Sequence, residues 1–283
     1  MTVTDLASRR GPRTAWVLGG GGNLGSVQVG MLRAVVERGE VPDLVVGCSV
    51  GSLNGLAMAA DPSLDGVERL RQIWLDIDSD HVFPSSRVSG PWMLLKKASS
   101  LYPADGLRDL IQRCAPHPNI EDYAIPFECV ATNLHTGRAR WFDRGPVLEP
   151  VLASAALPAA FPPVTVDGEE YIDGAVVDNV PISRALFHGV ARITVFHVGN
   201  FERPRPAPKR PIDVLLQSFS IARNFRFDSD LARVPENVEV TVLPAIDPGS
   251  MKRNDFSRTS ELISRAHAAA AAHLDLRDKH RTG

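Results

Sequence analysis

Ser49 is the residue of this chain whose surroundings point most directly to chemistry, because residues 47–51 read G-C-S-V-G. This G-x-S-x-G stands between an apolar, strand-like run and a run of small, helix-compatible residues, which is the context of a nucleophile elbow. A serine on such a sharp turn needs neighbours without bulk, and Gly47 and Gly51 would let the two backbones pass. The N-terminus of the following helix favours negative charge nearby. The same pattern also occurs in ordinary strand–helix loops, so this motif alone leaves both interpretations open.

A glycine-rich run at residues 20–25 reads G-G-G-N-L-G, after a first apolar run and before a helix-compatible stretch. It fits the dinucleotide-binding pattern G-x-G-x-x-G, but that use requires an acidic residue at the end of the next strand, about 20 residues on. That place holds Gly47, Cys48 and Ser49, and no acid is near.

We therefore favour an oxyanion hole for the glycine-rich run, in which backbone N–H groups at a helix start stabilise a developing negative oxygen. Because Ser49 ends the next predicted strand, the two turns should lie at the same edge of the sheet. A plain glycine-rich connector is the remaining alternative. The residues assigned to the hole are Gly20, Gly21, Gly22, Asn23 and Gly25.

A serine hydroxyl is a poor nucleophile at neutral pH and needs a base within hydrogen-bond reach. One candidate is Asp173, which stands before Gly174 and Ala175 and after a strand-like run. An aspartate before glycine is commonly only a turn. The surrounding text, I-D-G-A-V-V-D-N-V-P, adds a second acid at Asp178 and a proline, Pro181, that suits the start of a helix.

Histidine is the usual base for a serine, and the chain has eight histidines. His197 ends a predicted buried strand and lies downstream of Ser49 and Asp173, which is the chain order of an α/β-hydrolase triad. No histidine is framed by motif-like residues as Asp173 is, and we favour a structural role for His197. His188 would end a helix. The others are expected in loops or on the terminal helix: His81, His117, His135, His267, His273 and His280.

Strand-like and helix-like runs alternate along the chain, which predicts an α/β fold. Expected strands are 14–18, 43–46, 127–132, 138–142, 191–197 and 238–243, with a hairpin of 164–166 and 170–172. Expected helices follow Asn23 and span 52–60, 64–74, 105–114, 147–156, 181–187, 212–231 and 256–278. We predict one domain over residues 14–280, with a mostly parallel central sheet covered by helices on both faces and the elbow after its second strand. Residues 1–13 are expected to be a flexible tail.

Composition excludes several other classes of protein. The net charge of −2 gives no reason to expect a nucleic-acid partner. Three cysteines without regular spacing argue against a disulfide framework and against a thiolate metal site. The N-terminal residues lack the apolar core of a signal peptide, and no apolar run reaches membrane-spanning length. We expect a cytoplasmic protein that at most touches a membrane surface; its oligomeric state is left open.

Two segments depart from the regular pattern. Residues 82–104 hold prolines and the cluster W-M-L-L-K-K at 92–97, which would suit a lid or a segment in contact with lipid. A helix that packs its apolar face on the core is the alternative, and we favour it. Residues 203–211, rich in proline and arginine, are expected to be a solvated loop.

Taken together, residues 20–25, 47–51 and 173–175 resemble the ordered blocks of the patatin-like phospholipase family, as does the text from 153 to 164. The resemblance covers residues 15–181 and points to a domain of the bacterial patatin type. It implies a Ser–Asp dyad in place of a triad, with Ser49 as nucleophile, Asp173 as base and the backbone amides around residues 21–23 as oxyanion donors. A carboxylate of reference pKa ~3.9 is a weak base, so such a dyad requires a dry, apolar site that raises this pKa.

Two residues depart from the pattern of the family. Leu24 stands where the family often has Arg or Lys, which removes a cation from the glycine-rich run. Ala175 stands where a second glycine is frequent, a variant that the family also shows.

The resemblance implies a serine hydrolase that cleaves carboxylic ester bonds of lipids through an acyl-enzyme, with no metal or nucleotide cofactor. Acyl transfer to an acceptor other than water would use the same dyad. A non-catalytic lipid-binding or regulatory protein of the same fold is a further alternative, supported only by Leu24. A nucleotide-binding oxidoreductase ranks last, for want of the ribose acid.

Overall fold

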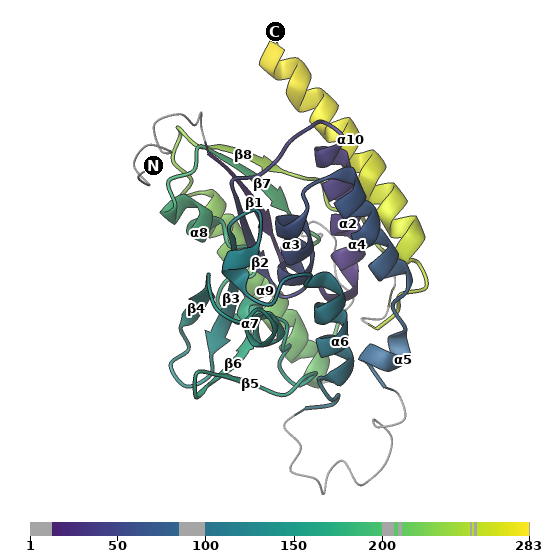
Figure 1. The fold of residues 1–283 in the computed structure, drawn as a ribbon, viewed down its shortest axis with the longest axis vertical. Coiled ribbons are helices and arrows are strands. Elements are labelled where there is room, and N and C mark those ends of the chain that lie inside the picture. Colours follow the sequence, from purple (N-terminus) through teal and green to yellow (C-terminus); the bar gives the residue numbers. More distant parts are fainter. Residues whose placement is uncertain are drawn as a thin grey trace, which may run out of the picture.

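The centre of the molecule is an eight-stranded β-sheet, shown in Figure 1. The computed structural model describes residues 13–84, 100–199, 207–208, 211–249, 251 and 254–282. The strand order is β5-β6-β3-β2-β1-β7-β8, and β4 pairs with β3. The strands are β1 (Thr14–Leu18), β2 (Leu44–Cys48), β3 (Phe127–Asn133), β4 (Ala139–Phe142), β5 (Val164–Val166), β6 (Glu169–Asp173), β7 (Arg192–Phe196) and β8 (Glu239–Val242).

The sheet is parallel over most of its width, as predicted. β3, β2, β1, β7 and β8 pair in parallel, whereas β4, β5 and β6 form antiparallel pairs at one side. Leu18 at the end of β1 pairs with Gly47 of β2. The carboxyl ends of these two strands therefore meet at one edge, so that the glycine-rich run and the elbow begin side by side.

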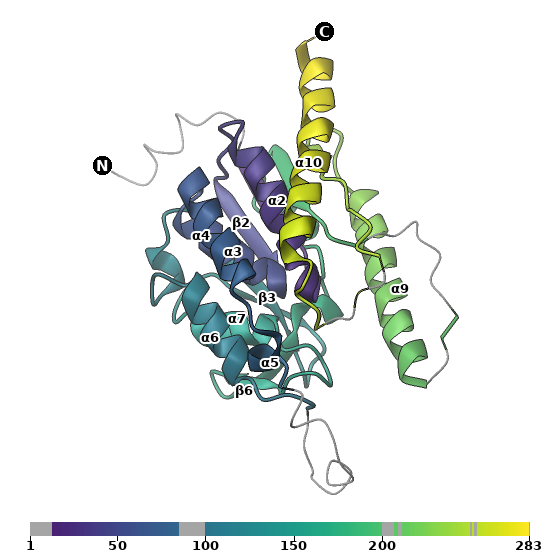
Figure 2. The same cartoon turned by 90° about the vertical axis from the view of Figure 1, so that its right-hand side faces the viewer.

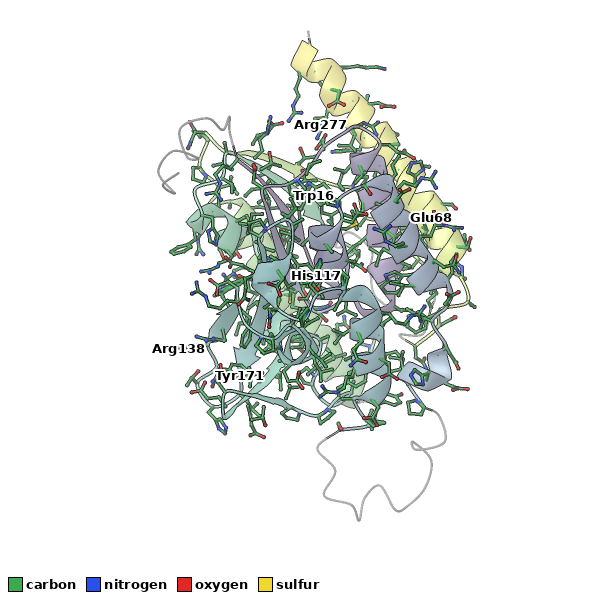
Figure 3. All side chains as sticks on the ribbon, in the orientation of Figure 1. Trp16, Glu68, His117, Arg138, Tyr171 and Arg277 are labelled. Carbon is green, nitrogen blue, oxygen red and sulfur yellow. The ribbon has the colours of Figure 1, made fainter. Side chains whose placement is uncertain are left out.

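Helices cover both faces of the sheet. Alternate residues of each parallel strand point to opposite sides, and both sets are apolar, so both faces have to be covered. Trp16 and Leu18 of β1 lie in one core, and Ala15 and Val17 lie in the other. Figure 3 places the label of Trp16 within the body of the molecule, and its side chain is fully buried. The helices are α2 (Gly25–Val36), α3 (Val50–Ala60), α4 (Leu64–Leu75), α5 (Ser79–Val82), α6 (Asp105–Cys114), α7 (Leu148–Ser154), α8 (Ile182–Phe187), α9 (Pro211–Leu231) and α10 (Thr259–Thr282), with short 3₁₀ turns η1 (Gly22–Leu24), η4 (Ile120–Asp122) and η5 (Gly174–Val176).

The two hydrophobic cores, one on each face of the sheet, differ in size. The larger core contains buried residues of α2, α3, α4, α6, α7 and α10. The smaller core is closed by α8 and by Phe227 of α9. Figure 2 shows α9 on the opposite side of the molecule from α3 and α4.

Several predicted element ends are wrong by a few residues. β2 was predicted to end at residue 46, but Gly47 and Cys48 also pair with β3, so the strand continues to the residue before Ser49. α3 begins at Val50, not at 52, because the turn at Ser49 leads directly into helix. α9 begins at Pro211, inside the predicted proline-rich loop, since the fixed φ of proline suits a first helical turn. α10 was predicted over 256–278, but it begins three residues later, at Thr259, and extends to Thr282.

Three predictions concern segments that lie wholly or largely outside the described residues. They are the tail at 1–13, of which only Arg13 is described; the lid or interfacial segment at 82–104, of which 85–99 are not; and most of the loop at 203–211. The membrane contact expected from residues 92–97 stays a prediction for the same reason. Among the described residues, no helix combines the length and the apolar character needed to span a membrane.

Candidate active site

Ser49 occupies a strained turn between β2 and α3. Its backbone angles are φ 54° and ψ −127°, and a positive φ is unusual for a residue with a side chain. The flanking glycines are needed for close approach: a Cβ on Gly47 would lie 2.6 Å from the carbonyl oxygen of Gly51, and a Cβ on Gly51 would lie 2.2 Å from that of Leu18. Ser49 is partly exposed, whereas Cys48 and Val50 on either side are buried. The turn thus presents the serine while its neighbours pack.

Asp173 accepts a hydrogen bond from the Ser49 hydroxyl, with Oγ 2.7 Å from Oδ2. The aspartate is the last residue of β6, and its other carboxylate oxygen accepts from the backbone N–H of Ala175 at 2.8 Å. Its backbone carbonyl accepts from the Thr132 hydroxyl at 2.9 Å. The structure therefore brings together the two residues that the sequence separates by more than a hundred positions.

Burial makes Asp173 a stronger base than an exposed aspartate. The side chain is about 1% exposed, and this desolvation raises its pKa from 3.8 to about 6. The hydrogen bonds from Ser49 and from the Ala175 N–H, and the positive charge of Arg223, act in the opposite direction. A pKa near 6 leaves the carboxylate ionised at neutral pH and still basic enough to accept a proton.

The glycine-rich run lies against the elbow, as its position after β1 predicts. A Cβ on Gly20 would lie 3.0 Å from the Cβ of Ser49. The N–H of Gly20 donates to the carbonyl of Asn179 at 3.0 Å, and the N–H of Gly25 donates to the carbonyl of Gly22. These two amides are therefore occupied, which narrows the candidate oxyanion donors to the middle of the run.

The middle of the run is shaped by its own residues. Gly22 has a φ of 60°, which places its backbone in the left-handed region that glycine adopts without strain. The Asn23 side chain donates to the carbonyl of Asp255 at 2.8 Å and fastens the run to the segment before α10. Leu24, at the position where the sequence lacks a cation, packs against the larger core.

A buried polar network, which the sequence analysis missed, holds the glycine-rich run in place. Gln28 of α2 donates to the carbonyls of Gly19 at 2.7 Å and Phe196 at 3.0 Å. Asn54 of α3 donates to Gln28 Oε1 at 2.8 Å and accepts from the indole N–H of Trp74 at 2.8 Å. Each of these two helices has an amide residue in an otherwise apolar stretch of sequence. This pattern could have indicated the network, since a buried amide needs hydrogen-bond partners.

Ser154 is a second residue that the sequence analysis did not single out. Its hydroxyl accepts the backbone N–H of Ser49 at 3.0 Å and lies 2.8 Å from the hydroxyl of Ser52. The N–H of Ser49 is thus engaged within the protein, and α7 is tied to the elbow.

His197 is buried and stacks on Phe227 of α9, with ring centroids 4.8 Å apart. Its Nε2 accepts the backbone N–H of Gly199 at 3.2 Å. Desolvation lowers its pKa to about 3, so the imidazole is neutral over the physiological range. Because the Ser49 hydroxyl donates directly to a carboxylate, the structure supports the structural role that we favoured for His197.

Other titratable groups have partners that account for them. His188 ends α8 and lies 2.7 Å from a carboxylate oxygen of Glu128. Cys48 is buried with a pKa raised well above its usual value by desolvation, so its thiol stays protonated beside Ser49. Among the described residues, no group of three or more His, Cys, Asp or Glu side chains could hold a metal ion.

A cavity of about 540 Å³ lies between α3, α4 and α6, and it is lined in part by Ala57, Leu70 and Cys114. It opens toward the C-terminal end of α3, whereas Ser49 stands at the N-terminal end of the same helix. Neither Ser49 nor Asp173 lines it. This cavity is therefore not the place where an ester would meet the serine.

Comparison with known proteins places the chain in a family. The model of the patatin-like phospholipase family matches residues 16–186, which include the glycine-rich run, Ser49 and Asp173. The lysophospholipase NTE1 of Cryptococcus neoformans is 30% identical over 201 residues, which cover 69% of this chain and 12% of that protein. An uncharacterized NTE family protein of Mycobacterium bovis is 31% identical over 172 residues, 61% of this chain and 45% of that protein. The chain thus matches less than half of the length of either relative.

Among solved structures, VipD from Legionella pneumophila has a TM-score of 0.47 to this chain at 14% identity, over 93% of this chain and 67% of that chain. The family model covers more than half of the present sequence. The chain belongs to the patatin-like phospholipase family.

Proposed function

We propose that this protein hydrolyses carboxylic ester bonds of lipids, with Ser49 as the nucleophile and Asp173 as the base. The observation that carries the proposal is the 2.7 Å hydrogen bond from the hydroxyl of a serine at a strained elbow to a buried carboxylate. Burial raises the pKa of that carboxylate to about 6, which supports its use as a general base.

In the first half-reaction, Asp173 takes the proton of the Ser49 hydroxyl while Oγ bonds to the ester carbonyl carbon. The tetrahedral intermediate then expels the alcohol, whose oxygen receives the proton from Asp173. In the second half-reaction, water attacks the acyl-enzyme and gives a proton to Asp173. The acid leaves as Ser49 recovers its hydroxyl proton, so that both residues return to their starting state.

The negative oxygen of each tetrahedral intermediate needs fixed donors. We assign this role to the backbone N–H groups of residues 21–23, because the amides of Gly20 and Gly25 already donate within the protein. The left-handed backbone of Gly22 supports the assignment, since a side chain there would be strained in the conformation that turns the run toward α2. The start of α3 adds a favourable potential for negative charge.

The substrate class is proposed from the relatives. A fungal protein named lysophospholipase aligns over 69% of this chain. We therefore propose a monoacyl phospholipid as the first substrate to test, with the ester carbonyl at Ser49.

The test uses a fluorophosphonate probe, which labels activated serines, and the hydrolysis of a p-nitrophenyl ester. The wild-type chain should be labelled and should turn over the ester, and Ser49→Ala should abolish both. Labelling that persists in Ser49→Ala would place the nucleophile elsewhere. A wild-type chain that neither reacts with the probe nor hydrolyses any ester would favour a non-catalytic lipid-binding protein.

A further inference from the structure

Arg223 brings a positive charge to the active site from a distant part of the chain. It lies on α9, which contacts the turn η5 that directly follows Asp173. Its Nη1 donates to the side-chain oxygen of Asn179 at 3.3 Å. Its guanidinium lies over the ring of Phe219, with Cζ 4.9 Å from the ring centroid. Two contacts from different segments therefore hold the guanidinium on the inner side of α9.

Asn179 joins Arg223 to the glycine-rich run and to the nucleophile. Its backbone carbonyl accepts the N–H of Gly20 at 3.0 Å. A Cβ on Gly20 would lie 2.7 Å from Asn179 Oδ1 and 3.0 Å from the Cβ of Ser49. The amide oxygen that accepts from Arg223 is thus next to the nucleophilic serine. The positive charge of Arg223 acts to lower the pKa of Asp173, Cys48 and His197.

The described residues of the glycine-rich run supply no cation to the site. The glycine-rich run contains no lysine or arginine, and Leu24 packs against the larger core. The next arginine on α9, Arg226, is committed to two buried carboxylates, at 2.6 Å from Asp230 and 3.7 Å from Asp178. The two arginines lie three positions apart on one helix and make different contacts. The positive charge of Arg223 lowers the pKa of Asp173.

We propose that Arg223, held by Asn179, forms a subsite for the anionic phosphate of the substrate, so that the protein prefers lipid esters with a phosphate next to the glycerol backbone. The proposal rests on the hydrolase function proposed above and adds to it the residue that binds the phosphate of the substrate. A guanidinium suits this role because its planar donors match phosphate oxygens and its charge is permanent. In a monoacyl phospholipid only the glycerol backbone separates the ester at Ser49 from the phosphate.

The experiment compares two substrates that differ only in the phosphate: a 1-acylglycerol 3-phosphate and the 1-acylglycerol with the same chain, both at pH 8. The wild-type chain should prefer the phosphate-bearing ester. Arg223→Gln should lower kcat/KM for that ester by roughly 10- to 100-fold, mainly through KM, because a charge-assisted contact is lost. The loss on the neutral ester should be smaller, so that the ratio of kcat/KM between the two esters falls toward one.

Two further variants keep the result interpretable. Arg223→Lys should recover part of the preference, since it restores the charge without the planar donors. Arg233→Gln removes the same charge from a largely exposed side chain beyond the end of α9 and should leave both substrates unaffected. Thermal unfolding of each variant, together with the turnover of the neutral ester, shows that the active site is intact.

The outcomes separate the hypotheses. Equal losses on both esters in Arg223→Gln, or no loss on either, would overturn the phosphate subsite while leaving the hydrolase intact. Inhibition of neutral-ester turnover by inorganic phosphate, in a wild type without preference for the phosphate ester, would show a site for free phosphate and overturn the headgroup role. Failure of the hydrolase function itself would appear as absence of turnover of every ester by wild type.

Discussion

Asp173 and Asp178 lie five positions apart and are buried to almost the same extent. Neutral donors contact the carboxylate of Asp173, whereas a guanidinium lies beside that of Asp178. Desolvation raises the pKa of each from 3.8 to about 6. The carboxylate of Asp173 accepts from a serine hydroxyl and from a backbone N–H. That of Asp178 accepts from Ser183 and lies 3.7 Å from the guanidinium of Arg226.

This difference supports the proposal that Asp173 serves as the base, whereas Asp178 helps to attach α9. The ion pair with Arg226 holds the carboxylate of Asp178 against α9, which suits a structural role. In the proposed reaction Asp173 acts on the Ser49 hydroxyl that donates to it. The positive charge of Arg223 lowers the pKa of Asp173 without a salt bridge between the two side chains. Of the two arginines of α9, Arg226 pairs with Asp178 and Asp230, and Arg223 donates to Asn179 beside the glycine-rich run.

The largest effect on activity should separate the two aspartates when each carboxylate is replaced by an amide. Asp173→Asn should lower kcat/KM for a p-nitrophenyl ester by about 10³- to 10⁴-fold, because the amide cannot accept the serine proton. Asp178→Asn should stay within about tenfold of wild type. Comparable losses of kcat/KM in both variants would show that the two aspartates do not have different roles. Activity that survives Asp173→Asn but is lost in His197→Ala would replace the dyad with a histidine triad.

The second effect concerns stability and pH. The folded-state pKa of Asp178 lies above its unfolded value, so the folded chain binds the extra proton between about pH 4 and 6. The contribution of this group to the free energy of unfolding is present below that window and is lost as pH rises through it. Relative to wild type, Asp178→Asn should therefore gain about 3 kcal/mol between pH 3 and pH 7 in urea unfolding. A difference that does not vary with pH would show that ionisation of Asp178 carries no penalty in the folded state.

The third effect concerns the pH profile of catalysis. The kcat/KM of wild type for a neutral ester should rise with pH and level off above about 6, as Asp173 ionises. Because the charge of Arg223 lowers the pKa of Asp173, Arg223→Gln should move this limb to higher pH, by less than about one unit.

Arg226→Gln is the matched variant on the same helix and should leave the limb in place while lowering stability, since it removes the cation between Asp178 and Asp230. Equal movement of the limb in both arginine variants would mean that the two side chains act on the dyad in the same way.

Local patterns predicted much of the fold and the position of the site. The glycines around Ser49 are required by contacts between the backbones of β1, β2 and α3, and such a requirement is visible in a sequence as small residues at set positions. The parallel sheet followed from the alternation of strands and helices. Element ends such as Cys48 and Pro211 were missed because they depend on pairing and on packing with distant segments.

Residues that support the site from a distance could not be predicted in the same way. Gln28, Asn54 and Ser154 stand in apolar or small-residue stretches, and their partners come from other elements. Arg223 is one of many arginines in the sequence and has no motif around it. Its relevance follows from the packing of α9 beside the turn after Asp173.

The elbow, the glycine-rich run and the aspartate could be singled out from residue types alone, because strained turns and close backbone contacts restrict the residues at those positions. The fold shows which amides of the run already donate within the protein and that the serine hydroxyl donates to Asp173. It also placed one of the two α9 arginines where its charge acts on the dyad. These properties depend on distance and burial, which arise when segments far apart in the chain pack together.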